Sequence, residues 1–383
     1  MERAGRAAAV AGEHAQAADR ESRFPSEAIA ALRKERLLGV HVEPALGGEQ
    51  ASLLDLTRIA YLLGQHCASS AMIFAMHQSQ VACLARHWRG PKRDAFLRSV
   101  VEEQLLVASS TSEKGGDGGI RWSGCALSEA DGKVSLSKQA PVISYGAQAS
   151  AILATARRTP TADARDQVLV LFPQGSYELR QTSEWDALGM RATCSAGYDL
   201  SASVDHAFVL DDPFSDVLRR TILPVAHILW AGVWIGVAAD AVRRARDHAR
   251  QVARRGAKAI RSVSILPRLR AAVGQMEASL MAAIRFYDTI SDPADEAALT
   301  DLTVEMNSLK MATSQGALNV VSDAMVAVGL PAYVNNGSSS LGRHLRDIYS
   351  GVAMIHNERI SSDLYQLLLI APSRSQLLQS NSE

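Results

Sequence analysis

Residues 106–119 have the sequence Leu-Val-Ala-Ser-Ser-Thr-Ser-Glu-Lys-Gly-Gly-Asp-Gly-Gly, and the character of the chain changes here. The stretch begins with apolar and hydroxyl-bearing residues, a composition that favours a short β-strand. Glycines follow, and glycine lets a backbone come close to a ligand. The pattern is typical of a loop that binds polar ligand atoms, and it also occurs in ordinary surface turns.

The sequence before this stretch has the apolar spacing of helices. Residues 25–39 carry apolar side chains at helical intervals and end at Gly39, and the pattern continues through residues 53–63 and 69–87. These segments predict a helical N-terminal domain, residues 1–105.

After residue 105 the pattern changes to short β-branched runs between glycine-rich or charged turns. These runs predict a middle β-domain, residues 106–213, with strands near residues 105–111, 133–138, 141–145, 151–156, 167–172 and 198–204. Helical spacing then returns and predicts a helical C-terminal domain, residues 214–383, with long segments at 222–255, 264–290, 296–328 and 357–369.

The composition is that of a soluble globular protein. Of 383 residues, 47% are hydrophobic and 21% charged, and the 40 basic and 40 acidic residues balance. A net charge of zero argues against nucleic-acid or anionic-membrane binding. The four cysteines lack metal-ligand spacing, and the N-terminus lacks the apolar core of a signal peptide. We therefore expect a cytoplasmic protein that binds no metal.

Seven segments, in order, resemble the acyl-CoA dehydrogenase superfamily. The flavin loop of that family is similar to residues 106–119, and its last turn before the final helix is similar to Leu-Gly-Arg-His-Leu-Arg-Asp-Ile-Tyr-Ser-Gly (341–351). The other five segments are residues 24–39, 42–48, 67–78, 138–156 and 185–204. The resemblance implies an α+β multidomain fold with an N-terminal helical domain, a middle β-barrel-like domain and a C-terminal four-helix bundle.

The resemblance also implies a flavoprotein oxidoreductase that binds FAD and acts on an acyl thioester of coenzyme A or acyl carrier protein. It implies a homotetramer or homodimer, and the long apolar segments 222–239 and 309–328 favour such assembly.

The family pattern assigns flavin contacts to particular residues of this chain. Val142 stands where the family usually has an aromatic residue against the flavin ring, and Leu330 replaces one of two glycines near the adenosine half. The residues expected to contact the cofactor are Ser110, Ser112, Gly115, Gly118, Ser144, Arg254, Gly329 and Asn357. Arg254 is equally consistent with a solvated helix end, where a cation suits the helix dipole.

The catalytic glutamate of the family is missing. Counting from Arg346-Asp347 places Ile355 at its position, and matching Ile-Tyr-Ser-Gly instead places Ser350 there. The second position used in the family, at the start of the first bundle helix, has Ala226-His227. A dehydrogenase needs a base to remove the α-proton of the thioester.

Three interpretations are open. The first is α,β-desaturation with a non-standard base, for which Glu358, His356 and His77 are the candidates. The second is a flavin-dependent monooxygenase, in which Ser144, His77 or His356 would support oxygen chemistry. The third is a non-redox member of the fold.

Each candidate base also has a structural explanation. His77 on an apolar helix is typical of a core histidine, His356 suits a helix cap, and Glu358 suits the first turn of a helix.

Overall fold

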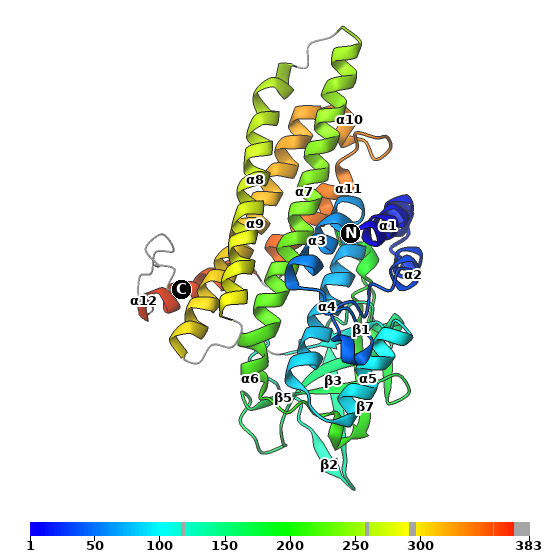
Figure 1. Cartoon of the computed structure of the whole chain (residues 1–383), viewed down its shortest axis with the longest axis vertical. Coiled ribbons are helices and arrows are strands. Elements are labelled where there is room, and N and C mark those ends of the chain that lie inside the picture. The colour runs from blue at the N-terminus through cyan, green and yellow to red at the C-terminus, as the bar shows by residue number, and fades with distance from the viewer. Residues whose placement is uncertain (116–118, 257–259, 291–295, 355, 371–383) are drawn as a thin grey trace.

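The computed structural model describes residues 1–115, 119–256, 260–290, 296–354 and 356–370. Figure 1 shows N-terminal helices beside a long C-terminal bundle, with the strands of the middle domain below them. The predicted order of helical, β and helical parts is confirmed.

Five helices form the N-terminal part: α1 (Glu2–Glu21), α2 (Ser26–Lys34), α3 (Leu53–His66), α4 (Ala68–His87) and α5 (Pro91–Glu102). Helix α1 has no counterpart among the predicted helices. Its buried face consists of small side chains, which give a weak apolar signal: Ala4, Ala7, Ala8, Ala11, Ala15 and Ala18.

The middle part contains two sheets rather than one closed barrel. The first sheet has the order β1-β4-β5 and consists of β1 (Val107–Ser110), β4 (Ala151–Arg157) and β5 (Gln167–Pro173), with β1 parallel to β4. The second sheet has the order β2-β3-β7-β6, is antiparallel, and consists of β2 (Ser128–Ala130), β3 (Lys133–Ala140), β7 (Gly197–Asp205) and β6 (Tyr177–Ser183).

Residues 141–145, predicted to form a strand, form a turn instead. Tyr145 has a φ of 44° and leads into a short 3₁₀ helix, η2 (Gly146–Gln148). The turn bends the chain between β3 and β4, which belong to different sheets, so Val142 and Ser144 lie at a corner of the domain.

The C-terminal part begins with α6 (Phe214–Val217) and a π-helical turn, η5 (Leu218–Ile222). The long helices α7 (Leu223–Arg254), α8 (Ile260–Thr289) and α9 (Glu296–Val328) follow. The chain ends with α10 (Leu330–Tyr333), α11 (Gly342–Ala353) and α12 (Asn357–Ile370). Helix α11 packs on α7 and α9, whereas α12 contacts the lower end of α9 and leads away from the bundle (Figure 1).

The stretch Phe214–Arg254 is long and apolar enough to cross a membrane, but 78% of its most apolar window is buried inside the protein. Helix α7 packs against α3, α4, α8 and α9. Its apolar surface is therefore largely used within one chain, and it supplies little support for the expected tetramer.

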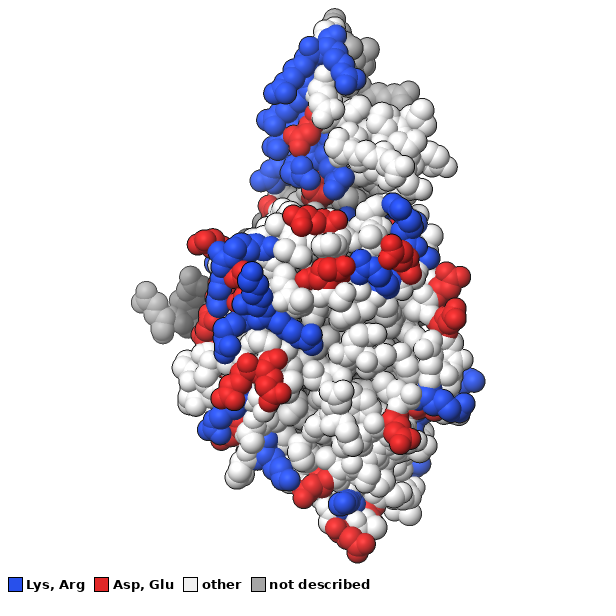
Figure 2. All heavy atoms as spheres, turned by 90° about the vertical axis from the view of Figure 1, so that its right-hand side faces the viewer, with Lys and Arg blue, Asp and Glu red and all other residues white. Residues whose placement is uncertain are grey.

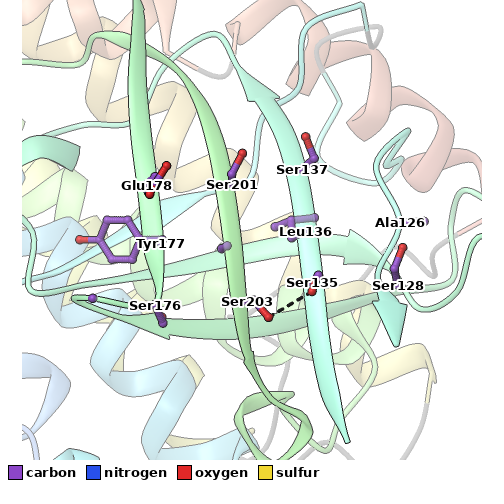
Figure 3. A pocket seen from close by; sticks show the side chains of 12 residues that line it. Ala126, Ser128, Ser135, Leu136, Ser137, Ser176, Tyr177, Glu178, Ser201 and Ser203 are labelled. Atoms are coloured by element: carbon purple, nitrogen blue, oxygen red, sulfur yellow. Dashed lines mark hydrogen bonds between the residues drawn. The ribbon is translucent and has the colours of Figure 1, made fainter. Parts of the chain in front are cut away.

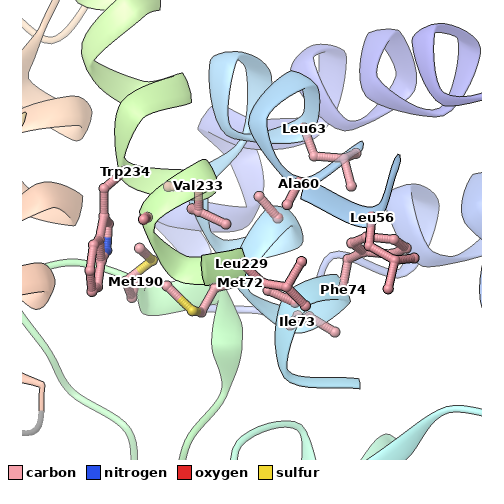
Figure 4. Close-up of a cluster of buried hydrophobic side chains, with 14 of the residues drawn as sticks. Leu56, Ala60, Leu63, Met72, Ile73, Phe74, Met190, Leu229, Val233 and Trp234 are labelled. Atoms are coloured by element: carbon pink, nitrogen blue, oxygen red, sulfur yellow. The ribbon is translucent and has the colours of Figure 1, made fainter. Parts of the chain in front are cut away.

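Three parts of the chain meet in one buried cluster, shown in Figure 4. It contains Leu56, Ala60 and Leu63 of α3, Met72, Ile73 and Phe74 of α4, Leu229, Val233 and Trp234 of α7, and Met190 of the β-domain. Glycines allow α3 and α7 to approach closely. A Cβ at Gly64 would lie 2.6 Å from the Val233 carbonyl oxygen, and one at Gly236 would overlap the Tyr61 carbonyl.

We expect Gly236→Ala to destabilise the protein by about 1–3 kcal/mol, because the new methyl group collides with rigid backbone. The matched control is Gly5→Ala in α1, where a Cβ meets nothing within 4 Å. That variant should gain up to about 1 kcal/mol from helix propensity. Urea unfolding of both variants measures the two effects, and equal stabilisation would contradict the close helix crossing.

Candidate active site

Two adjoining cavities lie between the β-domain and the C-terminal helices. Cavity A has a volume of about 470 Å³. Its lining includes Gln80 of α4, Ser109 of β1, Ser112 of the segment after β1, His227 of α7, Asn307 of α9 and Asp363 of α12. Cavity B has a volume of about 500 Å³ and is mainly apolar, with Met72, Trp185, Leu188, Met190, Tyr349 and Ala353 in its wall. Met76, Val142, Ser144 and Met354 line both cavities and form what we term the junction.

A chain of hydroxyl groups runs away from the junction. The Ser144 and Ser195 hydroxyl oxygens are 2.8 Å apart, and Ser195 is 2.8 Å from the Thr193 hydroxyl. Thr193 also donates to the Met190 carbonyl at 2.8 Å in one arrangement of these protons. Because each hydroxyl has one proton, donation from Thr193 to the Met190 carbonyl makes Ser195 donate to Thr193 and Ser144 donate to Ser195, which leaves the lone pairs of Ser144 facing the junction. If Thr193 instead donates to Ser195, and Ser195 to Ser144, the Ser144 proton can point into the junction.

The 109–121 loop is fastened to the sheets by a buried ion pair. Glu113 lies 3.6 Å from the Lys138 ammonium, which is fully buried and donates to the Thr155 carbonyl and hydroxyl at 2.8 Å. Glu113 also accepts hydrogen bonds from Ser123 and from the backbone N–H of Cys125. These contacts fix the wall of cavity A that carries Ser109 and Ser112.

Three buried polar side chains line cavity A: Gln80, Asn307 and His227. The amide groups of Gln80 and Asn307 and the Nε2 atom of His227 make no hydrogen bond to the described residues. His227 donates from Nδ1 to the Met306 carbonyl at 3.2 Å. Burial, followed by the positive charge of Lys310, lowers the pKa of His227 to about 3. The imidazole is therefore neutral, and its Nε2 is an acceptor.

Lys310 of α9 holds the segment between α11 and α12. Its ammonium donates to the Met354 carbonyl at 2.8 Å and to the Asn357 side-chain oxygen at 2.6 Å, and it lies 5.9 Å from the centre of the Trp234 ring. Asn357 in turn donates to Ser314 at 3.1 Å. Burial lowers the pKa of Lys310 to about 8. Lys310 thus sets the position of Met354 at the junction.

Among the predicted bases, His77 lies in the protein core. Its Nε2 contacts the Leu38 carbonyl at 2.8 Å, and its Nδ1 accepts from the Val107 N–H at 3.1 Å. Burial lowers the pKa of His77 to about 4. Both ring nitrogens are thus used in joining α4 to β1 and to the loop after α2, which leaves neither available to remove a proton.

The other two candidates lie at the start of α12 and differ in direction. His356 lines cavity A, whereas Glu358 is exposed and lines neither cavity. The residues that line cavity A here are His356, in the turn before α12, and Arg359, Ile360 and Asp363 of α12. Their spacing of three, one and three residues is that of one helical face. Asp363 was not among the sequence candidates, although this spacing is the signal that identifies it.

The predicted flavin contacts are partly brought together. Ser112 and Ser144 line cavity A, and Ser110 is buried beside them with a hydroxyl oxygen that has no partner among the described groups. Gly115 is exposed, with a φ of 83° and open space where a side chain would point. Gly118 lies outside the described residues. The hydroxyls of this wall suit the polar edge of a flavin ring.

The remaining predicted contacts lie elsewhere. Asn357 is bound to Lys310. Arg254 ends α7, 27 residues after His227, so it is about 40 Å away along the helix. Figure 2 shows Lys and Arg gathered at this end of the molecule, over the C-terminal part of α7. Gly329 lies at the same end, between α9 and α10. Only a second protomer could bring Arg254 and Gly329 to these cavities.

A further hollow of about 670 Å³ lies on the outer face of the second sheet, shown in Figure 3. Its exposed floor carries Ser135, Ser137, Ser201 and Ser203, and the Ser135 hydroxyl donates to Ser203 at 3.1 Å. Glu178 is the one charged residue in its described lining. The hollow therefore lacks the buried polar groups that distinguish cavity A.

Comparison with known proteins identifies the family of this architecture. The N-terminal domain of the acyl-CoA dehydrogenases matches residues 5–104, and their C-terminal domain matches residues 216–354. The amino sugar nitrososynthase DnmZ of Streptomyces peucetius is 24% identical over 347 residues, which cover 87% of this chain and 83% of DnmZ.

Two solved structures have the same fold over nearly their whole length. FMN-bound TdsC from Paenibacillus sp. A11-2, a dibenzothiophene monooxygenase, has a TM-score of 0.86 at 18% identity, covering 96% of both chains. Butyryl-CoA dehydrogenase from Megasphaera elsdenii has a TM-score of 0.81 at 16% identity, covering 96% of this chain and 98% of that one. Oxygenases and dehydrogenases therefore share this fold.

We expect the stability of the protein to fall as the pH decreases from about 6.5 to 4. Burial lowers the pKa of His77 and His344 to about 4 and that of His227 to about 3. A depressed histidine pKa stabilises the fold above the unfolded value of about 6.5, and this stability is lost as the pH falls toward the folded value. Each histidine contributes a slope of about 1.4 kcal/mol per pH unit.

His77→Gln should remove one of these three slopes, since glutamine can still donate and accept. Urea unfolding at several pH values, compared with the exposed His206→Gln, measures the difference. Parallel curves for wild type and His77→Gln would contradict the buried, neutral state of His77.

Proposed function

We propose a function for this chain, which belongs to the acyl-CoA dehydrogenase family: it is a flavin-dependent monooxygenase. Its flavin ring would bind at the junction, and its substrate would bind in cavity A. The flavin, once reduced by an external electron donor, would supply two electrons to O₂, so that one oxygen atom enters the substrate and the other leaves as water. The chain's own residues bind and orient the two molecules and exclude bulk water.

The observation that carries this proposal is the composition of the junction. Its four residues are Met76, Val142, Ser144 and Met354, and none is a carboxylate. Among the described residues, cavity B has no carboxylate in its wall, and cavity A has Asp363 alone. A desaturase needs a base beside the flavin, whereas oxygen transfer needs hydrogen-bond donors and a dry site.

The hydroxyl chain supplies such a donor. Ser144 is the one polar residue of the junction, and its proton can point into the junction when Thr193 donates to Ser195 and Ser195 donates to Ser144. Cavity B is walled mainly by apolar side chains such as Met72, Trp185 and Met190, which exclude water. A hydrogen-bond donor beside the reacting atoms stabilises the negative charge that develops on oxygen. Ser144 is thus the residue best placed to act on oxygen chemistry at the junction.

A dehydrogenase acting on an acyl thioester is the second candidate. Asp363 favours it, because a carboxylate on the inner face of α12 lies in the cavity and could take a proton. His356 occupies the same helical face, and Glu358 does not.

The two functions are separated by supplying their different reactants. With reduced FMN, O₂ and a panel of small amines and heterocycles, we expect products heavier by one oxygen atom in the mass spectrum. Ser144→Ala should lower the product formed per reduced flavin on the order of 10²-fold. The matched control is Ser135→Ala, which removes a similar hydroxyl pair on the outer sheet face.

Anaerobic bleaching of bound flavin by an acyl thioester would contradict the oxygenase and establish the dehydrogenase. Asp363→Asn, His356→Asn and Glu358→Gln would then identify the base by a loss of about 10²–10⁴-fold in bleaching rate. If neither oxygenation nor bleaching occurs, both proposals fall and the protein is a non-redox member of the fold.

We further propose that the flavin is FMN, although the sequence resemblance predicts FAD. Of the groups expected for the adenosine half, Arg254 lies about 40 Å from His227 along α7 within one protomer. Gly329 lies at the same end of the molecule, after α9. Leu330, which replaces the second glycine, is 73% exposed and would crowd that half. Similarity to FMN-bound TdsC also supports FMN.

We expect the protein to bind FMN with an affinity at least equal to its affinity for FAD, and to quench the fluorescence of the bound flavin. Arg254→Ala should leave FMN binding unchanged. Titration of the purified protein with each flavin measures this. An affinity for FAD at least tenfold greater, lost in Arg254→Ala, would instead support the FAD prediction and a partner subunit at the site.

A further inference from the structure

Cavity A contains a polar group that the proposed chemistry leaves unexplained. His227 is 3% exposed, lines the cavity, and uses only its Nδ1 atom within the protein. Because the Met306 carbonyl can only accept, Nδ1 carries the proton, and Nε2 bears a lone pair without a partner among the described residues. Buried polar groups are normally hydrogen-bonded, so an unsatisfied acceptor facing a cavity indicates a ligand.

The contrast with other histidines of this chain strengthens this point. Both ring nitrogens of His77 are bonded to backbone, and both nitrogens of His87 are bonded, to Asp212 and Thr221 at 2.7 Å. The surroundings of His227 add two further unsatisfied side chains, Gln80 and Asn307, in the same cavity wall. The protein thus satisfies both nitrogens of His77 and His87 internally. His344 bonds to Asp240 through Nε2 and leaves a buried Nδ1 without a partner among the described residues, but it lines neither cavity, so His227 is the one of these four histidines whose unsatisfied nitrogen lines a cavity.

The charge of Lys310, in addition to burial, affects the protonation state of His227. The ammonium of Lys310 has no carboxylate partner among the described residues, and its uncompensated charge disfavours a second positive charge on His227. A histidine kept neutral in this way is a weak base at ordinary pH. It is well suited to accept a hydrogen bond, and His227 therefore orients a ligand rather than removing its proton.

We propose that His227 Nε2 accepts a hydrogen bond from the substrate in cavity A, so that the cavity selects compact, largely apolar molecules with an N–H or O–H group. This inference depends on the proposed function in one respect, namely that the bound molecule is the substrate. The neighbours of His227 in the cavity include aliphatic side chains and Trp230, whose ring lies 5.9 Å from that of His227 between centres and whose buried Nε1 has no hydrogen-bond partner among the described residues. The apolar surfaces of these side chains suit the remainder of such a molecule. A ligand of the same shape that has no N–H or O–H donor would cover His227 Nε2 without giving it a hydrogen bond. Such a ligand should bind more weakly, because burying an unsatisfied acceptor costs free energy.

Indole and indene test this selectivity, since they share shape and size and only indole has an N–H donor. Calorimetric titration of the purified protein, with and without added FMN, should show that indole binds roughly tenfold more tightly than indene. His227→Leu should abolish the preference, and His227→Gln, which retains an acceptor, should restore part of it. The matched control is His41→Gln, because His41 makes a similar contact to the Ala51 carbonyl and does not line either cavity.

Equal affinities for the two probes in the wild type, no binding of either probe, or a preference that survives in folded His227→Leu would each overturn the inference. Thermal unfolding shows whether each variant is folded. If His227→Leu does not fold, His227→Gln is compared with the wild type instead. The readout is independent of oxygenation. A protein that prefers indole but forms no oxygenated product would retain this inference while losing the proposed function.

Discussion

The buried carboxylate of Asp347 is the contact on which the arrangement of the three domains depends. It accepts a hydrogen bond from the Met190 N–H at 2.8 Å, while the adjacent Arg346 donates to Asp19 of α1 and to the Leu188 carbonyl, both at 3.0 Å. Two consecutive residues of α11 thus hold the N-terminal domain and the β-domain loop. Burial raises the pKa of Asp347 to about 6, so this contact is costly to maintain ionised, and the surrounding donors are needed to retain it. The wall of cavity B, which includes Leu188, Met190 and Arg346, is built on it.

The order of helical and β parts could be predicted because it depends on local periodicity, which one chain displays fully. The errors have particular causes. Residues 141–145 are β-branched and apolar enough for a strand, but they connect two different sheets and therefore turn. Strand β6 was missed because most of its side chains are exposed and it lacks an apolar alternation. Helix α1 packs through alanines. In each case tertiary position, rather than local preference, decides the structure.

The candidate site was less predictable because a cavity depends on which face of each element points inward. The sequence identified the correct helix start, residues 356–358, but His356 before α12 and Asp363 on it line the cavity, whereas Glu358 does not. His227 stood beside the expected alternative base position, and its neutral state depends on burial and then on Lys310, 83 residues later on α9, neither of which the sequence displays. Hydroxyl-rich wall residues such as Ser112 and Ser144 could be predicted, since their sequence pattern itself carries the signal.

The absence of the family's glutamate accompanies an unusual environment for Lys310. A carboxylate there would neutralise Lys310, whose ammonium instead binds two neutral oxygens, those of Met354 and Asn357. A buried cation with neutral ligands leaves a positive potential in the adjoining space, and burial lowers its pKa to about 8 in response. Burial, and after it this potential, keeps His227 neutral, and the potential favours neutral or anionic molecules in the cavities. Lys310 therefore bears on two features of the site, because its charge adds to the burial that keeps His227 neutral and its ammonium holds Met354 at the junction.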